Sequence, residues 1–207
     1  MVIETDDALF ARARALVARG GRQILGIAGP PGGGKSTVAR AVVAELGPAA
    51  RLVPMDGFHL AQAELVRLGR ADRKGALDTF DGAGYVALLR RLRENTDDVV
   101  YAPDFRREIE EPVNGAVAVP RDVPLVITEG NYLLHDVGPW AGAARLLDET
   151  WYVDIDDAVR EERLVRRHEQ FGRSTEAARA WVASTDAPNA RLIAATKARA
   201  DHVLAWS

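Results

Sequence analysis

Two hydrophobic patterns alternate along the chain. Short runs of mainly apolar residues, bounded by glycine, proline or charged residues, are typical of buried β-strands. Longer stretches with apolar residues three and four positions apart are typical of helices that bury one face. The runs predict strands at 22–28, 51–55, 123–128 and 149–153, with shorter candidates at 99–101 and 202–205.

The helical pattern fills most of the segments between these runs. In the stretch 35–46, three valines and a leucine recur at helical spacing until Gly47 and Pro48 end the helix. Strands separated by helices usually pair in parallel, so the sequence predicts an α/β fold with helices on both faces of a parallel sheet. The other predicted helices are one that begins after Asp6-Asp7 and stops at Gly20-Gly21, and those at 60–68, 84–93, 157–168, 174–184 and 188–199.

The segment 104–120 fits neither pattern. It is charged and irregular, and it ends in four alternating alanine and valine residues at 116–119. We expect it to form an excursion near a binding site and to contribute little to the core.

Composition limits the class of protein. A chain of 207 residues can bury one substantial core, and we expect a single domain over residues 1–207. The formal net charge is −3, from 27 basic and 30 acidic residues, which gives no overall basic field for nucleic acid. The absence of cysteine excludes disulfides and thiolate metal sites, and the four histidines are widely separated.

Targeting signals are not evident in the sequence. The N-terminus lacks the basic start and apolar run of a signal peptide, and no stretch approaches the eighteen or so apolar residues that span a bilayer. We therefore expect a cytoplasmic enzyme with no membrane partner. A homodimer is compatible with the sequence, which does not fix the oligomeric state.

One motif points directly to a ligand. The residues Gly29, Pro30, Pro31, Gly32, Gly33, Gly34, Lys35, Ser36 and Thr37 fit the phosphate-binding pattern G-x-x-x-x-G-K-[ST]. They follow a predicted strand and open a predicted helix, which is the context that this loop requires. A glycine-rich hairpin or helix cap is the alternative interpretation. The motif predicts a P-loop NTPase fold.

The chemistry of this loop follows from its backbone. The three consecutive glycines leave successive N–H groups free to surround an anion, and the helix that follows adds its positive end. Lys35 would place an ammonium against the β- and γ-phosphates of ATP, and the Ser36 hydroxyl would hold Mg²⁺. The cofactors expected are therefore ATP and Mg²⁺.

Two carboxylates follow other predicted strands. Asp56 comes after the strand 51–55, and Glu129 comes after the strand 123–128. Because parallel strands bring their carboxyl ends to one edge of the sheet, both should lie near the P-loop. Asp56 is a candidate base for a substrate hydroxyl, and Glu129 a candidate Mg²⁺ partner through water. Alternatively, Asp56 is only a turn residue and Glu129 only caps the next turn.

Arginines gather on the predicted helix at 157–168. Arg160, Arg163 and Arg167 are three and four residues apart and share one face, while Arg166 can pair with Glu162. Such a helix, as part of a lid at about 157–173, could close over the phosphates, balance their charge and exclude water. A solvated helix held by salt bridges would have a similar sequence.

Several motifs occur together in a characteristic order. The P-loop is followed by the segments 55–59, 73–75, 78–81 and 127–132, and by the arginine helix after the strand 149–153. In this order they resemble the phosphoribulokinase and uridine kinase family, which includes bacterial pantothenate kinase and short nucleoside or sugar kinase-like proteins. The resemblance covers nearly the whole chain. It implies that the aspartate at position 56 is the base, that Glu129 lies at the metal and that Arg163 and Arg167 engage the phosphates.

The resemblance also implies where the acceptor binds. Uridine kinases usually carry Asp-Ser-Phe-Tyr where this chain has residues 56–59, Asp-Gly-Phe-His, and the segment 73–75, Arg-Lys-Gly, is closer to pantothenate kinase. The two arginines at 106–107 would suit an acidic or phosphorylated acceptor, or would pair with Glu108, Glu110 and Glu111. His59 could contact the substrate or cap the next helix. The expected substrate residues are Phe58, His59, Lys74, Arg106 and Asn131.

The function expected from the sequence is an ATP-dependent kinase. It would transfer the γ-phosphoryl group to a hydroxyl of a small metabolite, such as a nucleoside, a pantothenate-like compound or a sugar. A nucleotide-binding regulator or a degenerate kinase without an acceptor is the alternative. The guanine-specifying Asn-Lys-x-Asp motif of a GTP switch is missing, because no asparagine of the chain is followed by lysine.

Overall fold

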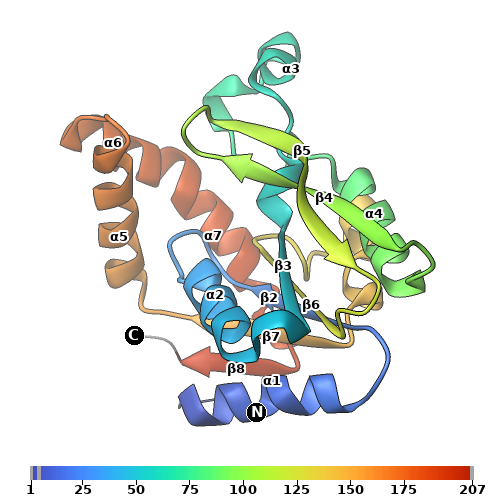
Figure 1. Ribbon diagram of the computed structural model, residues 1–207. Coiled ribbons are helices and arrows are strands. Elements are labelled where there is room, and N and C mark those ends of the chain that lie inside the picture. The colour runs from blue at the N-terminus through green and yellow to red at the C-terminus, as the bar shows by residue number, and fades with distance from the viewer. Residues whose placement is uncertain (1, 4–5, 206–207) are drawn as a thin grey trace.

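The structure is a computed structural model that describes residues 2–3 and 6–205, and it is organised around a parallel β-sheet (Figure 1). Six strands lie in the order β1-β8-β7-β2-β6-β3, and each neighbouring pair is parallel. The carboxyl ends of β2, β6 and β3 therefore meet at one edge. The strands of this sheet are β1 (Val2–Ile3), β2 (Gln23–Ala28), β3 (Ala50–Pro54), β6 (Leu125–Gly130), β7 (Glu149–Asp154) and β8 (His202–Ala205).

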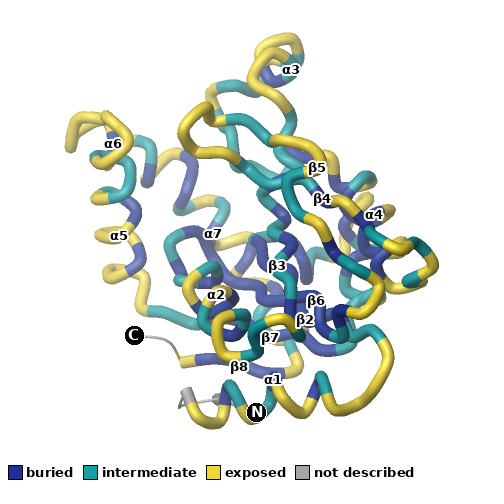
Figure 2. The backbone as a smooth tube through the Cα atoms, viewed as in Figure 1, coloured by how far each residue is buried: buried dark blue, intermediate teal, exposed yellow. Residues whose placement is uncertain are grey.

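Helices cover both faces of the sheet, as predicted. Side chains alternate across the strands, so Leu25 and Ile27 join the core under α1 and α2, and Ile24 joins the core under α4. Figure 2 shows that the strands are largely buried. The helices are α1 (Asp6–Ala18), α2 (Lys35–Leu46), α3 (Gln62–Arg67), α4 (Gly82–Glu94), α5 (Asp157–Gln170), α6 (Thr175–Trp181) and α7 (Ala187–Ala194).

Most predicted elements are confirmed, with differences at their ends. The helix predicted at 60–68 is confined to Gln62–Arg67. The two helices predicted at 174–184 and 188–199 are joined by a short π-helical stretch, Val182–Asp186, and α7 ends at Ala194. The strand β1 was not predicted, because two residues carry no periodic pattern of their own.

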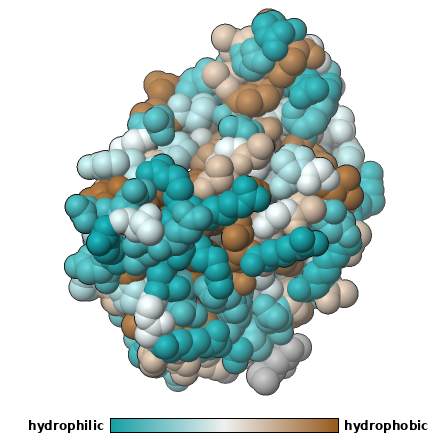
Figure 3. All heavy atoms as spheres, turned by 90° about the vertical axis from the view of Figure 1, so that its right-hand side faces the viewer, coloured by the Kyte–Doolittle hydropathy of each residue, from teal (hydrophilic) through white to brown (hydrophobic). Residues whose placement is uncertain are grey.

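The prediction that residues 104–120 are irregular is wrong. They belong to an antiparallel hairpin of β4 (Val99–Arg106) and β5 (Glu111–Pro120), separate from the main sheet. Its register shifts between Ala102 and Asp104, as is usual where proline interrupts a ladder. Val119 is the one buried residue of β5, and the short alanine and valine run at 116–119 does not by itself mark the whole strand. Figure 3 shows the face of the molecule on this side, where hydrophilic side chains separate the apolar patches.

The hairpin lies against the turn that follows β3. That turn is a short 3₁₀ helix, Met55–Phe58. A Cβ at Gly57 would come 2.4 Å from the carbonyl oxygen of Pro103 in β4, so only glycine allows this contact. The hairpin is thereby held beside Asp56.

The arginine-bearing helix α5 and the helix α6 extend from the sheet as an antiparallel pair (Figures 1 and 2). Asp156 caps the start of α5, since its side chain accepts hydrogen bonds from the backbone N–H groups of Ala158 and Val159. The pair forms the wall of a large cleft whose opposite wall is the hairpin and the segment around α3.

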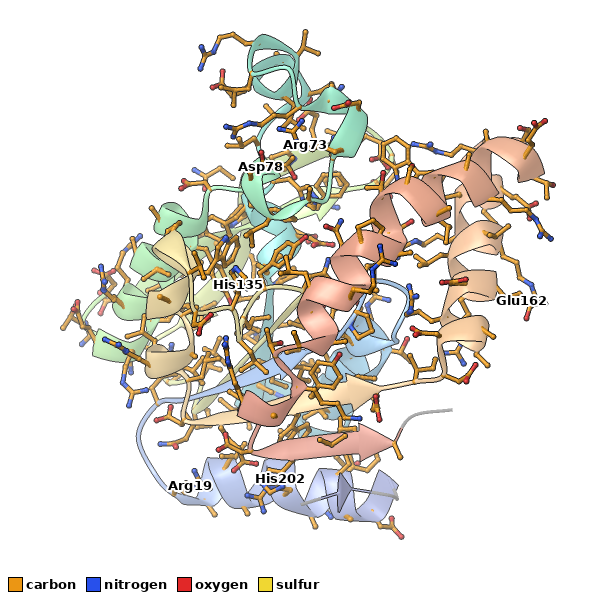
Figure 4. All side chains as sticks on the ribbon, turned by 180° about the vertical axis from the view of Figure 1, so that it is seen from behind. Arg19, Arg73, Asp78, His135, Glu162 and His202 are labelled. Carbon is orange, nitrogen blue, oxygen red and sulfur yellow. The ribbon has the colours of Figure 1, made fainter. Side chains whose placement is uncertain are left out.

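A buried ionic network ties α1 to the sheet at the opposite side from this cleft. The Glu149 carboxylate, 3% exposed, accepts hydrogen bonds from Arg12 at 2.5 Å, Arg19 at 3.0 Å and the Trp151 indole at 2.8 Å. His202 lies 3.7 Å from the same carboxylate. Figure 4 shows Arg19 and His202 together beside α1.

Replacing Glu149 by leucine is expected to lower the free energy of unfolding by about 2–4 kcal/mol. The change removes two ion pairs and leaves the buried indole N–H of Trp151 without an acceptor. Urea denaturation measures the effect, with the m-value unchanged.

The matched control is Glu45→Leu. Glu45 pairs with Arg14 of the same helix α1, but both side chains are exposed, so a loss below about 0.5 kcal/mol is expected. Equal losses for the two variants would contradict a role of burial in this network.

Within residues 2–3 and 6–205, none of the helices is both long enough and apolar enough to cross a membrane.

Candidate functional site

The P-loop joins β2 to α2 at the base of the cleft. Its backbone passes through the left-handed region at Gly32 and Gly34, and Gly34 is the N-cap of α2. A Cβ at Gly32 would lie 2.8 Å from Cγ of Leu164 and 3.0 Å from the carbonyl oxygen of Arg160. The helix α5 therefore packs directly on the loop, which only glycine permits. Successive loop N–H groups and the start of α2 can together bind an anion.

Lys35 is held in place by two oxygen acceptors. Its ammonium donates hydrogen bonds to the Pro30 carbonyl at 2.9 Å and to Oδ1 of Asn131 at 2.8 Å. Burial lowers the pKa of Lys35, while Glu129 and Asp56 act in the opposite direction. A buried ammonium in this position is placed to bind phosphate oxygens.

Ser36 and Glu129 form the second pair. The Ser36 hydroxyl donates to Oε1 of Glu129 at 2.8 Å, and Glu129 is 6% exposed at the end of β6. Burial raises the pKa of Glu129, the Asp56 charge raises it further, and Lys35 partly offsets both. A cation beside Glu129 would stabilise its charged form.

These two residues fit Mg²⁺ by the chemistry of their oxygens. Mg²⁺ binds through one or two protein oxygens and completes its shell with water and phosphate. Among the residues that the structure describes, no three His, Cys, Asp or Glu side chains are grouped to hold a metal by themselves. Ser36 and Glu129 could therefore hold Mg²⁺ only together with a bound phosphate chain.

Asp56 lies next to this pair. Residue Pro54 of β3 is in register with Glu129 of β6, so the 3₁₀ turn after β3 brings Asp56 to the same edge. The Asp56 side chain is 33% exposed, and Arg107 lies 3.6 Å from its Oδ2. A carboxylate that is accessible and near the phosphate site has the geometry of a general base.

Phe58 and His59 follow Asp56 but face different surroundings. Phe58 packs on the core, with its ring 5.3 Å from that of Tyr85, and does not line the cleft. His59 lines the cleft, and its Nδ1 lies 2.8 Å from the carbonyl oxygen of Asp56. Its ring packs between Phe80 and Phe105, at 4.0 and 4.8 Å. Burial lowers the pKa of His59, so its neutral form is favoured.

The structure brings Arg107, and not Arg106, into the cleft. The side chain of Arg106 is exposed and does not line it, whereas Phe105 and Arg107 do. Consecutive side chains of a strand point to opposite faces, so Arg106, the last residue of β4, faces away from the side of Phe105. Arg107 lies in the turn that follows β4. Arg107 pairs with Asp56, and within the described residues it forms no salt bridge with the neighbouring glutamates. Recognition of the strand 99–106 in the sequence would have revealed this alternation.

Lys74 and Asn131 both line the cleft. Lys74 donates to the Glu110 carbonyl at 2.5 Å, and its ammonium lies 5.2 Å from the centre of the Phe105 ring. Asn131 was expected at the acceptor, but its side-chain oxygen is the partner of Lys35. It therefore acts on the P-loop side of the cleft in this structure.

The lid arginines have different environments. Arg163 and Arg167 line the cleft, whereas Arg160 is 2% exposed and pairs with Asp157 at 2.9 Å and with Glu161. Burial lowers the pKa of Arg167, and Arg107 lowers it further. The guanidiniums of Arg163 and Arg167 form no ion pair with any carboxylate in the described part of the chain.

The predicted pair of Arg166 and Glu162 is present, at 2.5 Å. Figure 4 shows Glu162 on the outer side of α5, away from α7. The outer face of α5 is thus a solvated, salt-bridged surface, and the two unpaired arginines belong to the face that lines the cleft.

The sequence also missed cleft residues that α5, α6, the π-helical stretch and α7 contribute. His168, Trp181, Asp186 and Asn189 line the same cleft, and Nε2 of His168 lies 2.9 Å from Oδ2 of Asp186. No local motif marks them, because the cleft forms only when the lid packs beside the sheet. The whole cleft has a volume of about 1430 Å³, enough for a nucleotide and a small second ligand.

Comparison with known proteins gives consistent results. Residues 24–205 match the model of the phosphoribulokinase/uridine kinase family. A provisionally assigned uridine kinase of Schizosaccharomyces pombe is 34% identical over 176 residues, which are 80% of this chain and 74% of that protein. A crystal structure from Silicibacter sp. TM1040, provisionally assigned as a fructose transport system kinase, is 36% identical, with a TM-score of 0.83 over 96% of this chain and 98% of that chain.

A more distant structure agrees in fold. YFH7 of Saccharomyces cerevisiae, provisionally assigned as a P-loop-containing kinase, has a TM-score of 0.84 over 98% of this chain and 100% of that chain, at 19% identity.

Proposed function

The chain belongs to the phosphoribulokinase/uridine kinase family of kinases, and from this premise we propose that it transfers the γ-phosphoryl group of ATP to a hydroxyl of a small metabolite. The observation that carries the proposal is the meeting of Lys35, Ser36, Glu129 and Asp56 at one edge of the sheet. A phosphate site and a base for the acceptor are thus adjacent.

Each group has a distinct part in the reaction. The P-loop backbone and Lys35 bind the β- and γ-phosphates, and Asp56 accepts the proton of the attacking hydroxyl. Arg163 and Arg167 balance the charge that spreads over the transferred group. Mg²⁺, held with Ser36 and Glu129, would neutralise phosphate charge. The packing of α5 on Gly32 keeps water away from one side of the loop.

The test is acceptor-dependent turnover of ATP. We expect at least one compound in a set of nucleosides, pantothenate, sugars and sugar phosphates to raise ADP release at least tenfold above background hydrolysis. Mass spectrometry should then detect the acceptor with one added phosphoryl group. Tight nucleotide binding without stimulation by any acceptor would instead favour a nucleotide-binding regulator.

A further inference from the structure

Two cations lie on the acceptor side of the cleft, away from the P-loop. The ring of Phe105 has the Lys74 ammonium 5.2 Å and the Arg107 guanidinium 5.8 Å from its centre. Both side chains line the cleft, and Arg107 lies 3.6 Å from Asp56. Lys35 beside the P-loop, together with Arg163 and Arg167 of α5, supplies positive charge for the phosphates of ATP. Arg107 and Lys74 are therefore available for a second ligand.

The donors of Arg107 are largely unused. A separation of 3.6 Å from Asp56 is longer than a hydrogen bond, and within residues 6–205 the Arg107 guanidinium donates no hydrogen bond. Both partners are partly exposed, so their ion pair is weak. Arg107 also lowers the pKa of Arg167, which means that two guanidiniums repel one another across the site. An anion near Arg107 would relieve this repulsion and satisfy its donors.

The loop that carries Lys74 is held on both sides. Arg73 donates to Asp78 at 2.9 Å, the Gly75 N–H donates to Oγ1 of Thr79 at 3.0 Å, and the Tyr132 hydroxyl donates to the Gly75 carbonyl at 2.8 Å. Figure 4 shows Arg73 and Asp78 side by side on this arm. The position of Lys74 is therefore fixed before any ligand binds, as a built binding site requires.

His59 adds a hydrogen-bond acceptor to the same wall. Its Nδ1 faces a carbonyl oxygen, which can only accept, so Nδ1 carries the proton in the neutral ring. Nε2 is then an acceptor, and no group in the described part of the chain donates a hydrogen bond to it. A hydroxyl group of a ligand would satisfy it.

We infer that the acceptor is a small hydroxylated anion whose carboxylate or phosphate group is bound by Arg107 and Lys74 while its reacting hydroxyl lies against Asp56. This inference depends on the proposed kinase function and specifies its substrate class. The hydroxyl oxygen forms the new bond to the γ-phosphorus, the bond from that phosphorus to the β–γ bridging oxygen breaks, ADP leaves and the hydroxyl proton passes to the Asp56 carboxylate.

The experiment compares acceptors that differ only in the anionic group. Suitable pairs are fructose with fructose 6-phosphate, glycerol with glycerol 3-phosphate, glycerol with glycerate, and pantothenol with pantothenate. The anionic member of at least one pair is expected to have a kcat/KM at least thirtyfold above that of its neutral partner. The phosphate and carboxylate pairs distinguish the two kinds of anion.

The variants Arg107→Gln and Arg106→Gln provide the matched comparison. They remove the same charge from adjacent residues, only one of which lines the cleft. Arg107→Gln is expected to raise KM for the anionic acceptor about tenfold to a hundredfold, with KM for ATP within about threefold. Arg106→Gln should change either constant by less than twofold. Circular dichroism and the melting temperature of both variants report whether the fold is retained.

Three results would overturn the inference, and they differ from failure of the kinase proposal. Neutral acceptors that perform as well as anionic ones, equal effects of the two glutamine variants, or unchanged KM in Arg107→Gln would each remove the anion site while leaving a kinase. If no acceptor of either charge stimulates turnover, the proposed function itself fails.

Discussion

Asp56→Asn is expected to reduce acceptor-dependent turnover by about a hundredfold or more. The amide has nearly the shape of the carboxylate, so the 3₁₀ turn that carries it should remain intact. It cannot accept the hydroxyl proton, which is the role proposed for Asp56 beside Glu129 and the P-loop. The affinity for ATP should remain nearly unchanged, because the proposed phosphate contacts come from the P-loop. Steady-state kinetics with a saturating acceptor, together with titration of a nonhydrolysable ATP analogue, measure the two quantities separately.

A second aspartate serves as the control for this variant. Asp72 is 82% exposed and does not line the cleft, so Asp72→Asn should leave turnover within about twofold. Turnover of Asp56→Asn that matches this control would remove Asp56 as the base. A parallel loss of ATP affinity would show instead that the change disturbs the nucleotide site.

The parts of the fold that the sequence predicts are those with a local cause. The strands β2, β3, β6, β7 and β8 are short, mainly apolar runs, and the P-loop carries its glycines and lysine in one stretch. The meeting of Asp56 and Glu129 was also predictable, because parallel strands align their carboxyl ends. None of these inferences required knowledge of the strand order.

The missed features depend on contacts between distant segments. The hairpin β4–β5 has few buried side chains of its own and lies against the turn at Gly57, so its strands could not be predicted from hydrophobicity alone. The choice between Arg106 and Arg107 required both the alternation along β4, which turns Arg106 away from the side of Phe105, and the position of the turn after Arg106. Asn131 was named among the expected substrate residues, and its contact with Lys35 was not foreseen because it joins residues 96 positions apart in the sequence.

The contact between Asn131 and Lys35 also bears on the second large expected effect, that of replacing Lys35. Lys35→Met should lower kcat by about 10²–10³-fold. Lys35 is 7% exposed and its ammonium is held by the Pro30 carbonyl and by Asn131, so it is already oriented before the nucleotide binds. As the bond to the leaving ADP breaks, negative charge develops on the oxygen between the β- and γ-phosphates. A fixed, buried cation stabilises that charge strongly, and methionine of similar length supplies none.

Lys197→Met is the matched control, because it removes the same charge outside the cleft. Lys197 pairs with Asp154 at 2.5 Å, and both side chains are more than two-fifths exposed. Its replacement should therefore leave kcat within about twofold. Rapid-quench measurement of a single turnover separates the chemical step from product release. A contradicting outcome is that Lys35→Met raises only KM for ATP and leaves the rate of the chemical step unchanged. Lys35 would then bind the ground state and the transition state equally. The stabilisation of the transition state would have to come from Arg163 and Arg167 of α5.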